Sequence, residues 1–545
     1  MLPPPPEGVL GDFQLPPLLT SLLFNRGITR PSEVEPFLAA DERLMGDPQL
    51  LPDVDRAIAR ILRALLNREL IAVYGDFDAD GVTATTVLTE GLSRLGGRVF
   101  AYIPHRQEGH GLSSSGLKEV RHRGATLVIT VDCGTGDHGE AEEARAIGLD
   151  LIITDHHRPT SDLPPALAVV NPQREDSTYP TRELAGVGVA FKLLQALYEA
   201  TGRKSPNELL DLVALGTVAD LVPLTRENRY LVRRGLQVLN ESRRPGIQEL
   251  KNYAGVRKVD TQAISHLLAP RLNAAGRIDH ASEAYALLVA TSTSEASSLA
   301  ARLERTNAER RSLTERVLEM AEQKLGLPVK EPILIVGDEN FPAGVNGLVA
   351  SKLVEKFYRP AVVLELGGEM SQGSCRSIPE FDVLAALSEC RELLTRFGGH
   401  AQAAGFILPT SKVELLHERL VQVALRELRG LDLQPTISID AEIPLSSLSG
   451  EVLDFLKGLE PFGPGNPVPT FLSRGVAVVD CQRVGENGEH LKLKLREGEV
   501  YWEAIGFDLG SLSEQVASSV DIVYNLGVDD WGGESLLRLE ILDLR

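Results

Sequence analysis

The sequence predicts an α/β protein in which one long helix joins two α/β modules and a small β-barrel follows at the C-terminus. Short β-rich runs alternate with helical patterns in two parts of the chain, which is typical of parallel sheets covered by helices. The stretch from Glu295 to Leu325 contains neither Pro nor Gly and predicts a single connecting helix. After about residue 431, short polar-apolar alternating runs indicate a barrel.

At 545 residues the chain is too long for one hydrophobic core, so we expect several domains. The predicted organisation is a helical N-terminal segment (1–65), a first α/β module (66–225), a helical region that includes the long connector (226–325), a second α/β module (326–430) and the barrel (431–545).

The composition, with 43% hydrophobic and 24% charged residues, is that of an ordinary globular protein. No apolar run approaches the ~20 residues needed to cross a bilayer. The N-terminus MLPPPPEGVLGDFQL lacks the basic and apolar regions of a signal peptide. The four cysteines are scattered without a C-x-x-C pair, which fits neither a disulfide framework nor a zinc site. We therefore expect a cytoplasmic protein that does not bind membranes.

The net charge of -20 argues against nonspecific coating of nucleic acid, although it allows a local basic channel. The segment 226–280 has eleven Lys and Arg against five Asp and Glu, an excess of six positive charges within an acidic chain. Either a solvated helical face or a nucleic-acid channel would explain this excess.

The strands of the first module are expected in four runs that each end in Gly, Pro, Asp or His. Helical patterns lie between these runs, and two amphipathic helical stretches precede them. The runs are LIAVYGD (70–76), RVFAYIP (98–104), ATLVITVDCG (125–134) and LDLIITDHH (149–157).

The second module repeats the strand and helix pattern after the connector. It begins with ILIVGD (333–338), a helix at 345–357 and PAVVLEL (360–366), and it closes with the glycine-rich FGGHAQAAGFIL (397–408). The barrel strands are expected at ISID (437–440), VAVVDCQRV (476–484), HLKLKLREG (490–498), YWEAIGF (501–507) and LLRLEIL (536–542).

Acidic residues and histidines follow several of the predicted strands. Because the carboxyl ends of parallel strands share one edge of a sheet, these side chains should meet in one crevice. Each acid alone could be a turn residue or a helix cap, as Asp155 could be. Together, the types of residue present indicate that Asp155, His156 and His157 are a set of metal ligands and not a cap. The residues concerned are Asp76, Asp78, Asp80, Asp132, Asp155, His156, His157 and Asp220, the last within an apolar segment.

Carboxylates gathered in this way need compensation, since two charges ~4 Å apart repel by about 4 kcal/mol at an effective dielectric constant of 20. Carboxylate and imidazole ligands without thiolates suit Mn²⁺ or Mg²⁺, and less exclusively Zn²⁺ or Fe²⁺. A carboxylate shared by two ions ~3.5–4 Å apart is typical of sites that cleave phosphate esters. The sequence therefore predicts a site for two divalent ions.

The triplet Asp155-His156-His157 resembles the signature of the DHH phosphoesterases, and GDFDADGVTAT, VDCG and VALGTVADLVPL resemble other motifs of that superfamily in the same order. GSCRSI and GGHAQAAGF resemble the accessory domain of its DHHA1 branch. More narrowly, LLFNRGI, LAPRLNAAGRIDHA (268–281) and EPFGPGNPVPTF (460–471) resemble the bacterial RecJ family of single-strand-specific DNA exonucleases.

The resemblance implies a 5′-to-3′ exonuclease of DNA repair and recombination that releases 5′-mononucleotides from single-stranded DNA. It implies that His157 stabilises charge at the scissile phosphate and that Asp132 and Asp80 are catalytic, with Asp132 bridging two Mn²⁺ or Mg²⁺ ions. The implied metal ligands are Asp76, Asp78, Asp80, Asp132, His156 and Asp220. The implied phosphate-binding residues are Arg106, Arg271, Arg277, Ser374, Arg376 and His400.

The barrel is similar to an OB-fold, on which Tyr501, Trp502 or Phe507 could stack bases, although core packing is an alternative for these aromatics. The resemblance further implies a monomer that works with a helicase and a single-strand-binding protein. Two positions depart from the family pattern. Tyr74 stands where relatives often carry a histidine, and Phe341-Pro342 replace a Trp-His pair.

Two other functions stay open at this point. A DHH phosphodiesterase of cyclic dinucleotides or short oligonucleotides, or a related pyrophosphatase, would share the metal motifs but would usually lack the barrel and the PRLNAAGR region. A non-catalytic replication scaffold would keep the fold without needing the acids of all four motifs, which are intact in this chain.

Overall fold

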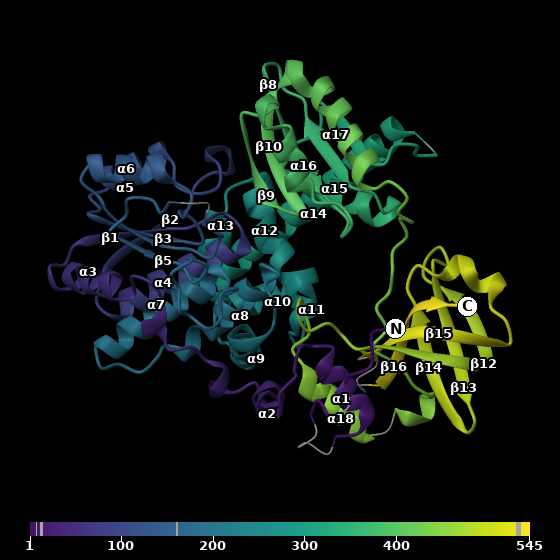
Figure 1. Ribbon diagram of the computed structural model, residues 1–545. Helices are drawn as coiled ribbons and strands as arrows, with labels where there is room; N and C mark the ends of the chain where they lie inside the picture. The colour runs from purple at the N-terminus through teal and green to yellow at the C-terminus, as the bar shows by residue number, and fades with distance from the viewer. Residues whose placement is uncertain (7, 11–14, 160–161, 327, 449, 530–535) are drawn as a thin grey trace.

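The computed structural model describes the chain except for residues 7, 11–14, 160–161, 327, 449 and 530–535. Figure 1 shows three bodies: a first α/β module, a second α/β module reached through the helix α14, and a C-terminal barrel beside the N-terminal helices. The predicted fold class is confirmed.

The first module is built on a parallel sheet with strand order β2-β1-β3-β4-β5. The predicted strand runs are confirmed, and a fifth strand extends the edge. The strands are β1 (Leu70–Tyr74), β2 (Arg98–Tyr102), β3 (Leu127–Val131), β4 (Asp150–Thr154) and β5 (Ala168–Val170).

Alternate side chains of this sheet enter two different cores, as the period of a strand requires. Ile71 and Val73 face a large core that also contains the helices on one side, whereas Ala72 and Tyr74 face a smaller core on the other. The large core uses α3 (Val54–Leu66), α4 (Ala79–Arg94), α7 (Gly186–Ala200) and α8 (Leu210–Ala219). The smaller core uses α5 (Ser114–His122) and α6 (His138–Ala146).

The helices that follow α8 continue the large core and do not form a core of their own. They are α9 (Arg226–Glu241), α10 (Pro245–Ala254), α11 (Thr261–Ala263), the π-helical turn η5 (Ile264–Leu268), α12 (Ala269–Ile278) and α13 (Ser282–Val289). The basic excess of segment 226–280 lies here, and much of it serves internal contacts. Arg229 is buried and donates to three backbone carbonyls, and Arg244 pairs with Glu90.

The predicted long helix is confirmed as α14 (Thr293–Leu325). Its first half packs through Leu299 and Leu303 into the core of the first module, whereas Val317 and Ala321 pack into the second. Because each end belongs to a different core, the helix fixes the two modules relative to each other.

The second module contains a mixed sheet with strand order β6-β7-β8-β10-β9. Its glycine-rich segment forms the antiparallel pair β9 and β10. The elements are β6 (Leu334–Asp338), α15 (Ala343–Phe357), β7 (Ala361–Glu365), β8 (Met370–Arg376), α16 (Val383–Glu389), β9 (Arg396–His400), β10 (Ala403–Pro409) and α17 (Val413–Glu427).

The C-terminal barrel is closed by pairing between its first strand and β15. The strands are β12 (Thr470–Val484), β13 (His490–Glu497), β14 (Val500–Gly506), β15 (Ser519–Asp529) and β16 (Leu536–Leu544), preceded by β11 (Ala441–Glu442) and α18 (Gly450–Leu459). The predicted strand at ISID was wrong, because residues 437–440 are irregular and Asp440 there binds Arg26 and Thr470. The prediction also missed β15, which supplies the closing contacts.

The N-terminal helices α1 (Pro17–Phe24) and α2 (Pro31–Ala39) share a core with the barrel segment. Arg229 of α9 ties this body to the first module, because it donates to Phe37 O and to Gly458 O and Leu459 O before the PFGPGNP stretch. Among the described residues, no helix is long and apolar enough to cross a bilayer. The predicted domain boundaries stay predictions.

Candidate metal centre and phosphate site

The six predicted metal ligands converge at the carboxyl edge of the first sheet. Asp76 follows β1, Asp78 caps α4, Asp132 follows β3 and His156 follows β4. Asp220 reaches the same place from the C-terminal end of α8, so its carboxylate comes from a helix end and not from a strand. Asp80, in the first turn of α4, completes the set.

Three groups of these side chains place ligand atoms within 4.8 Å of one another. Asp132 and His156 each belong to two groups, so both lie between the others. The groups are Asp76 with Asp78 and Asp132, Asp80 with His156 and Asp220, and Asp132 with His156 and His157.

Burial and mutual repulsion raise the pKa of four of these carboxyl groups, those of Asp78, Asp80, Asp132 and Asp220. Burial is the larger cause at each of the four, followed by a neighbouring carboxylate. The pKa of Asp80 rises to about 7 and that of Asp220 to about 9, and that of Asp132 rises well above its usual range. Such a cluster is stable only if protons or cations neutralise it.

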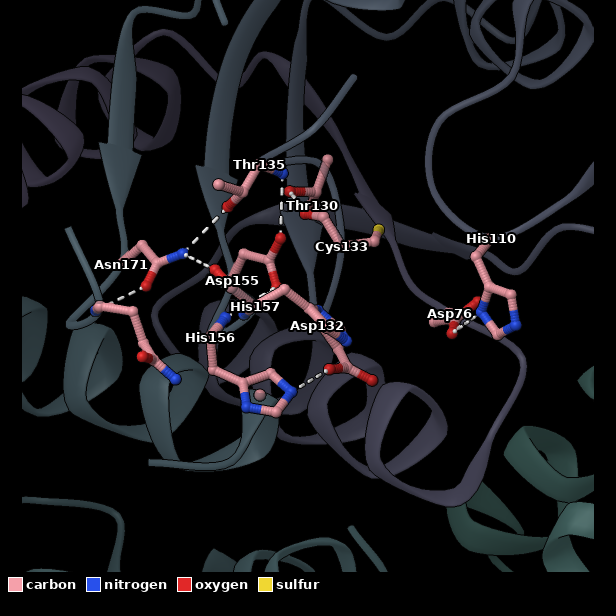
Figure 2. A network of polar contacts seen from close by, with 12 residues as sticks. Asp76, His110, Thr130, Asp132, Cys133, Thr135, Asp155, His156, His157 and Asn171 are labelled. Atoms are coloured by element: carbon pink, nitrogen blue, oxygen red, sulfur yellow. Dashed lines mark hydrogen bonds and ion pairs between the residues drawn. The ribbon is translucent and has the colours of Figure 1, made fainter. Parts of the chain in front are cut away.

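The unpaired atoms of the site favour a cation. Within the described part of the chain, Asp76 Oδ1, Asp132 Oδ1 and His156 Nε2 are buried and have no hydrogen bond. His156 Nε2 and Asp132 Oδ1 lie 3.1 Å apart, but the geometry is not that of a hydrogen bond (Figure 2). Burial, and then the charge of His157, lower the pKa of His156 to about 4, so its ring is neutral and has a free lone pair. These residues therefore fit Mn²⁺ or Mg²⁺.

The backbone holds the site in shape. Both carboxylate oxygens of Asp80 accept N–H groups at the start of α7, from Gly186 at 2.6 Å and Val187 at 2.8 Å. Asp78 accepts the N–H of Gly81 at 3.0 Å. Asp132 has a φ of 63°, a left-handed conformation that is uncommon for a residue other than glycine and that often marks functional sites.

Asp155 has a different role from the other acids. Its Oδ1 accepts from the backbone N–H groups of His156 (2.7 Å) and His157 (3.1 Å) and contacts His157 Nδ1 at 2.8 Å, and its Oδ2 accepts the N–H of Thr135 (Figure 2). Burial opposes the charged form of Asp155, but the His157 hydrogen bond and charge outweigh it and hold its pKa well below the usual range. The expectation that Asp155 is part of the ligand set is therefore corrected: its oxygens are occupied by N–H groups, and it orients the triplet.

His157 is more exposed than His156 and carries charge. Burial disfavours its imidazolium, but the hydrogen bond and charge of Asp155, followed by Asp220 and Asp76, raise its pKa to about 9. The exposed ring can therefore present a charged N–H to an anion beside the carboxylates.

A group of guanidinium side chains lies next to the carboxylates. Burial, and then the positive charges of Arg106, Arg310 and Arg376, lower the pKa of Arg277 to about 10. Burial also lowers the pKa of Arg106, while Asp76 and Asp78 oppose this effect. Among the described residues, none of the four arginines has an ion pair with an acidic side chain. Like charges gathered without ion pairs of their own indicate an anion site.

The arginine group (Arg106, Arg277, Arg310 and Arg376) comes from four elements. Arg106 lies in the turn after β2, Arg277 on α12, Arg310 on α14 and Arg376 at the end of β8. Ser374 is two residues before Arg376 and so lies on the same face of β8. Pattern reasoning missed Arg310, because nothing in the alternating charges of α14 distinguishes it from its neighbours.

His400 and Arg271 occupy different surroundings. His400 is exposed at the end of β9, and its charge contributes to lowering the pKa of His156, which places it near the metal centre. Arg271 is buried, pairs with Glu304 at 2.5 Å and donates to Leu267 O. The prediction that Arg271 binds substrate stays a prediction, and its guanidinium already serves to hold α12 against α14.

The two departures from the family pattern are explained by packing. The Tyr74 side chain is buried in the smaller core, which α5 and α6 cover, and its hydroxyl lies 3.3 Å from Ser113 Oγ. Phe341 is fully buried in the core below α15. A third histidine was not anticipated: His110 Nδ1 lies 2.9 Å from Asp76 Oδ2 (Figure 2).

Family models cover each module of the chain. The model described as "DHH family, N-terminal domain" matches residues 70–217, the DHHA1 domain matches 330–425 and the RecJ OB domain matches 439–543. A relative from Bacillus subtilis, named single-stranded-DNA-specific exonuclease RecJ, is 39% identical over 98% of this chain and 68% of its own length.

Two solved structures of RecJ from Thermus thermophilus resemble the whole chain. The complex with Mn²⁺ has a TM-score of 0.85 at 32% identity and covers 100% of this chain and 78% of that one. The complex with Mg²⁺ has a TM-score of 0.79 at 30% identity and covers 100% and 77%. With the converging carboxylates and the three family matches, these similarities lead to one conclusion: the chain belongs to the RecJ family of single-stranded-DNA-specific exonucleases.

Proposed function

We propose that this protein is a metal-dependent exonuclease that degrades single-stranded DNA from the 5′ end, releases 5′-mononucleotides and acts in DNA repair and recombination. The observation that carries the proposal is the position of Arg106, which lies near enough to Asp76 and Asp78 for their charges to act on it and near enough to Arg277 to act on that guanidinium. The proposed phosphate site thus adjoins the proposed metal site. An exonuclease needs this arrangement, because it binds one phosphate of the DNA and cleaves the bond at a neighbouring phosphate. The two alternative functions are set aside, because RecJ relatives match nearly the whole chain and an OB domain of the same family matches residues 439–543.

We assign the metal ligands from the geometry. Asp76, Asp78 and Asp132 would hold one ion, and Asp80, His156 and Asp220 the other, with Asp132 close enough to His156 to join the two sets. Two Mn²⁺ or Mg²⁺ ions, when bound, would supply a water of lowered pKa and positive charge for the phosphoryl oxygens.

Side chains of the protein would contribute to the reaction beside the metal ions. Asp155 holds the His157 ring through Nδ1, so the other ring nitrogen is free to donate to a phosphate oxygen on which charge develops. Asp80 keeps a fixed orientation because two backbone N–H groups bind it. The scissile phosphate thus meets an oriented cationic donor in a site whose carboxylates are already placed.

End recognition is assigned to the arginine group with Ser374 and His400. The guanidinium fork of Arg376 suits a terminal phosphate bidentately, and its neighbour Ser374 offers a hydroxyl. Arg376 and Ser374 belong to the second module, whereas the proposed metal ligands belong to the first. A DNA strand must therefore pass between the two modules to reach both sites. Double-stranded DNA is bulkier than a single strand, because it carries a second strand. We therefore expect the space between two modules of fixed relative position to disfavour binding of double-stranded DNA.

We assign to the outer face of the barrel the binding of the part of the DNA strand that extends beyond the active site. Lys492, Lys494 and Arg496 alternate as exposed residues on β13, and the exposed Tyr501 on β14 pairs across from Arg496. Lys494 Nζ lies 5.7 Å from the centre of the Tyr501 ring. Basic side chains beside an exposed aromatic suit the phosphates and bases of single strands.

The cellular setting is part of the same proposal. We infer a monomer in the cytoplasm, where its four free cysteines remain reduced, and which a helicase and a single-strand-binding protein supply with single strands.

The test uses one oligonucleotide labelled at either its 5′ or its 3′ end, with Mn²⁺ or with a chelator. We expect labelled mononucleotide at once from the 5′ label and only late from the 3′ label, no product with the chelator, and little from a blunt duplex. Early mononucleotide from the 3′ label would contradict the polarity, and unchanged cleavage with chelator would contradict the metal dependence.

A further inference from the structure

The start of α7 contacts two metal ligands through one residue, Gly186. Its N–H donates to Asp80 Oδ2 at 2.6 Å, and the next N–H, from Val187, donates to Asp80 Oδ1 at 2.8 Å. These are among the first N–H groups of the helix, which have no partner within it and favour an anion. The position of α7 therefore sets the orientation of Asp80.

The same glycine lies against Asp132. A Cβ at position 186 would be 2.6 Å from both the Cβ and Oδ1 of Asp132 and 2.8 Å from its Cγ. The Asp132 side chain has little freedom to yield, because it is short, its backbone φ is 63° and its N–H is bound to Thr154 O at 3.1 Å. Any side chain at position 186 would therefore displace a metal ligand or the helix.

The local backbone gives no other reason for glycine here. Gly186 is the first residue of a regular helix, in which glycine is less favourable than alanine. Two residues further along the same helix, a Cβ on Gly188 would meet Leu184 at 3.5 Å, which is an ordinary contact. The two glycines share one helix and differ in what they face.

We propose that Gly186 is a positioning residue of the metal centre, which holds Asp80 through its N–H and leaves room for Asp132 through its missing side chain. The inference rests on the proposed metal site and deepens it. Asp80 and Asp132 belong to different ligand groups, so one residue sets the relative position of both. A side chain here either turns Asp132 away from His156 or withdraws α7 from Asp80, and each movement separates the ligand sets.

The first experiment compares Gly186→Ala with Gly188→Ala by calorimetric titration of the full-length protein with Mn²⁺ in the absence of DNA. We expect Gly186→Ala to weaken Mn²⁺ binding by about 10- to 100-fold, the range for residues that orient metal ligands. Gly188→Ala should bind Mn²⁺ as the wild type does, because a Cβ at position 188 makes only an ordinary contact with Leu184. Equal Mn²⁺ affinity of Gly186→Ala and wild type would overturn the inference.

The second experiment tests the contact itself without metal. The Tm of the chelated protein is measured for Gly186→Ala, Asp132→Gly and the double variant, because a double-mutant cycle isolates the interaction between two residues. Asp132→Gly removes the three atoms that lie nearest to the new methyl and suits the positive φ. We expect Gly186→Ala to lower the Tm of the wild type and to leave that of Asp132→Gly unchanged.

The double-mutant cycle is also informative if Gly186→Ala alone does not fold. A folded double variant would then support the proposed contact between a side chain at position 186 and Asp132. An equal loss of Tm in both backgrounds, or an unfolded double variant, would overturn it. Failure of the wild type to bind Mn²⁺ is a distinguishable outcome, since it overturns the proposed function and this inference with it.

Discussion

His157 Nδ1 lies 2.8 Å from Asp155 Oδ1, and the same oxygen also accepts the backbone N–H groups of both histidines. A buried carboxylate with this many donors stays charged and fixes the ring that it contacts. Asn171 stabilises the backbone next to these residues, because its amide donates to His157 O at 2.8 Å and to Thr135 Oγ1 at 3.0 Å (Figure 2). The three residues of the triplet thus have three tasks: Asp155 orients, His156 offers a free lone pair and His157 carries charge.

Asp155→Asn should lower kcat and leave Mn²⁺ affinity nearly unchanged. The amide keeps the size of the side chain but removes the charge that raises the pKa of His157 to about 9, so less imidazolium is present at neutral pH. The loss should approach that of His157→Ala, for which we expect roughly 10²–10³-fold, as for removal of one donor to a developing charge. The measurement is kcat at saturating Mn²⁺, with a calorimetric Mn²⁺ titration as control. A normal kcat would show that the charge of Asp155 is not needed.

Asp132→Ala and Asp132→Asn should both abolish cleavage while the protein remains folded. Asp132 belongs to one proposed ligand set and lies 3.1 Å from His156 of the other, so we expect its loss to affect both ions. The asparagine variant also keeps a residue that tolerates the positive φ. Without metal, the Asn variant should have a higher Tm than wild type, since one repulsive carboxylate is gone. Turnover with excess Mn²⁺ and circular dichroism are the measurements, and near-normal turnover would remove Asp132 from the site.

The metal-free protein should lose stability as the pH rises. Burial first, and then neighbouring carboxylates, raise the pKa of Asp80 to about 7 and of Asp220 to about 9 in the folded state, whereas an unfolded aspartate titrates near ~3.9. Between these values the folded state binds more protons than the unfolded state, so the free energy of unfolding decreases with rising pH. The loss begins above the unfolded pKa and is complete above the folded values.

Urea unfolding in the presence of a chelator, at about pH 5 and about pH 8, measures this effect. Saturating Mn²⁺ should reverse the trend at the higher pH, because cations then neutralise the carboxylates. A metal-free protein that is more stable at the higher pH would mean that the cluster is already compensated from within the chain.

Arg376→Ala should weaken binding of a 5′-phosphorylated strand by about 1.5–3 kcal/mol, the range for a hydrogen bond to a charged group. Binding of a 5′-hydroxyl strand should change much less. Both strands are compared at one salt concentration, because phosphate contacts depend on salt. The matched control is Arg391→Ala, an exposed arginine of the same module. Equal losses on both strands would mean that Arg376 grips the backbone generally and that another residue recognises the end.

Tyr501→Ala combined with Lys494→Ala should weaken binding of long single strands without slowing cleavage of very short ones. Base stacking on an aromatic contributes ~1–3 kcal/mol per base, and both side chains lie on the outer face of the barrel. Removal of the whole barrel is a poorer test, since it would expose Leu22, Leu23 and Phe37, which share its core. Leu542→Ala, at another exposed apolar position, is the control. Unchanged affinity for long strands would assign the barrel face another task.

Much of the fold could be predicted because the relevant patterns are local. The β-branched runs at 70–74, 127–131 and 150–154 specify buried parallel strands, and parallel strands necessarily bring their carboxyl ends to one edge. That Asp76, Asp132 and His156 should meet follows from this geometry alone. Barrel strands were harder to predict, since a strand depends on its partners. ISID is irregular although it alternates, and β15 was missed.

Charge counting on the sequence identified a basic segment but could not say what its charges do. The structure places Arg229 inside the protein, on the carbonyls of residues 37, 458 and 459, and pairs Arg271 with Glu304. Arg277, from the same segment, joins the arginine group instead. The sequence shows only the number of charges, whereas their burial and partners depend on how helices distant in the chain pack together.

By itself, then, the sequence determined the kinds of element, the edge at which the proposed metal ligands gather and the chemical types of those side chains, because each depends on residues a few positions apart. Only the tertiary structure decided that Asp220 joins them from a helix end, that Asp155 orients instead of ligating, and that Gly186 lies between Asp80 and Asp132. The physical reason is distance along the chain: the bond from Gly186 to Asp80 joins residues 106 positions apart. No periodicity encodes such a contact, and only the packing of α7 against α4 and the sheet brings the two atoms together.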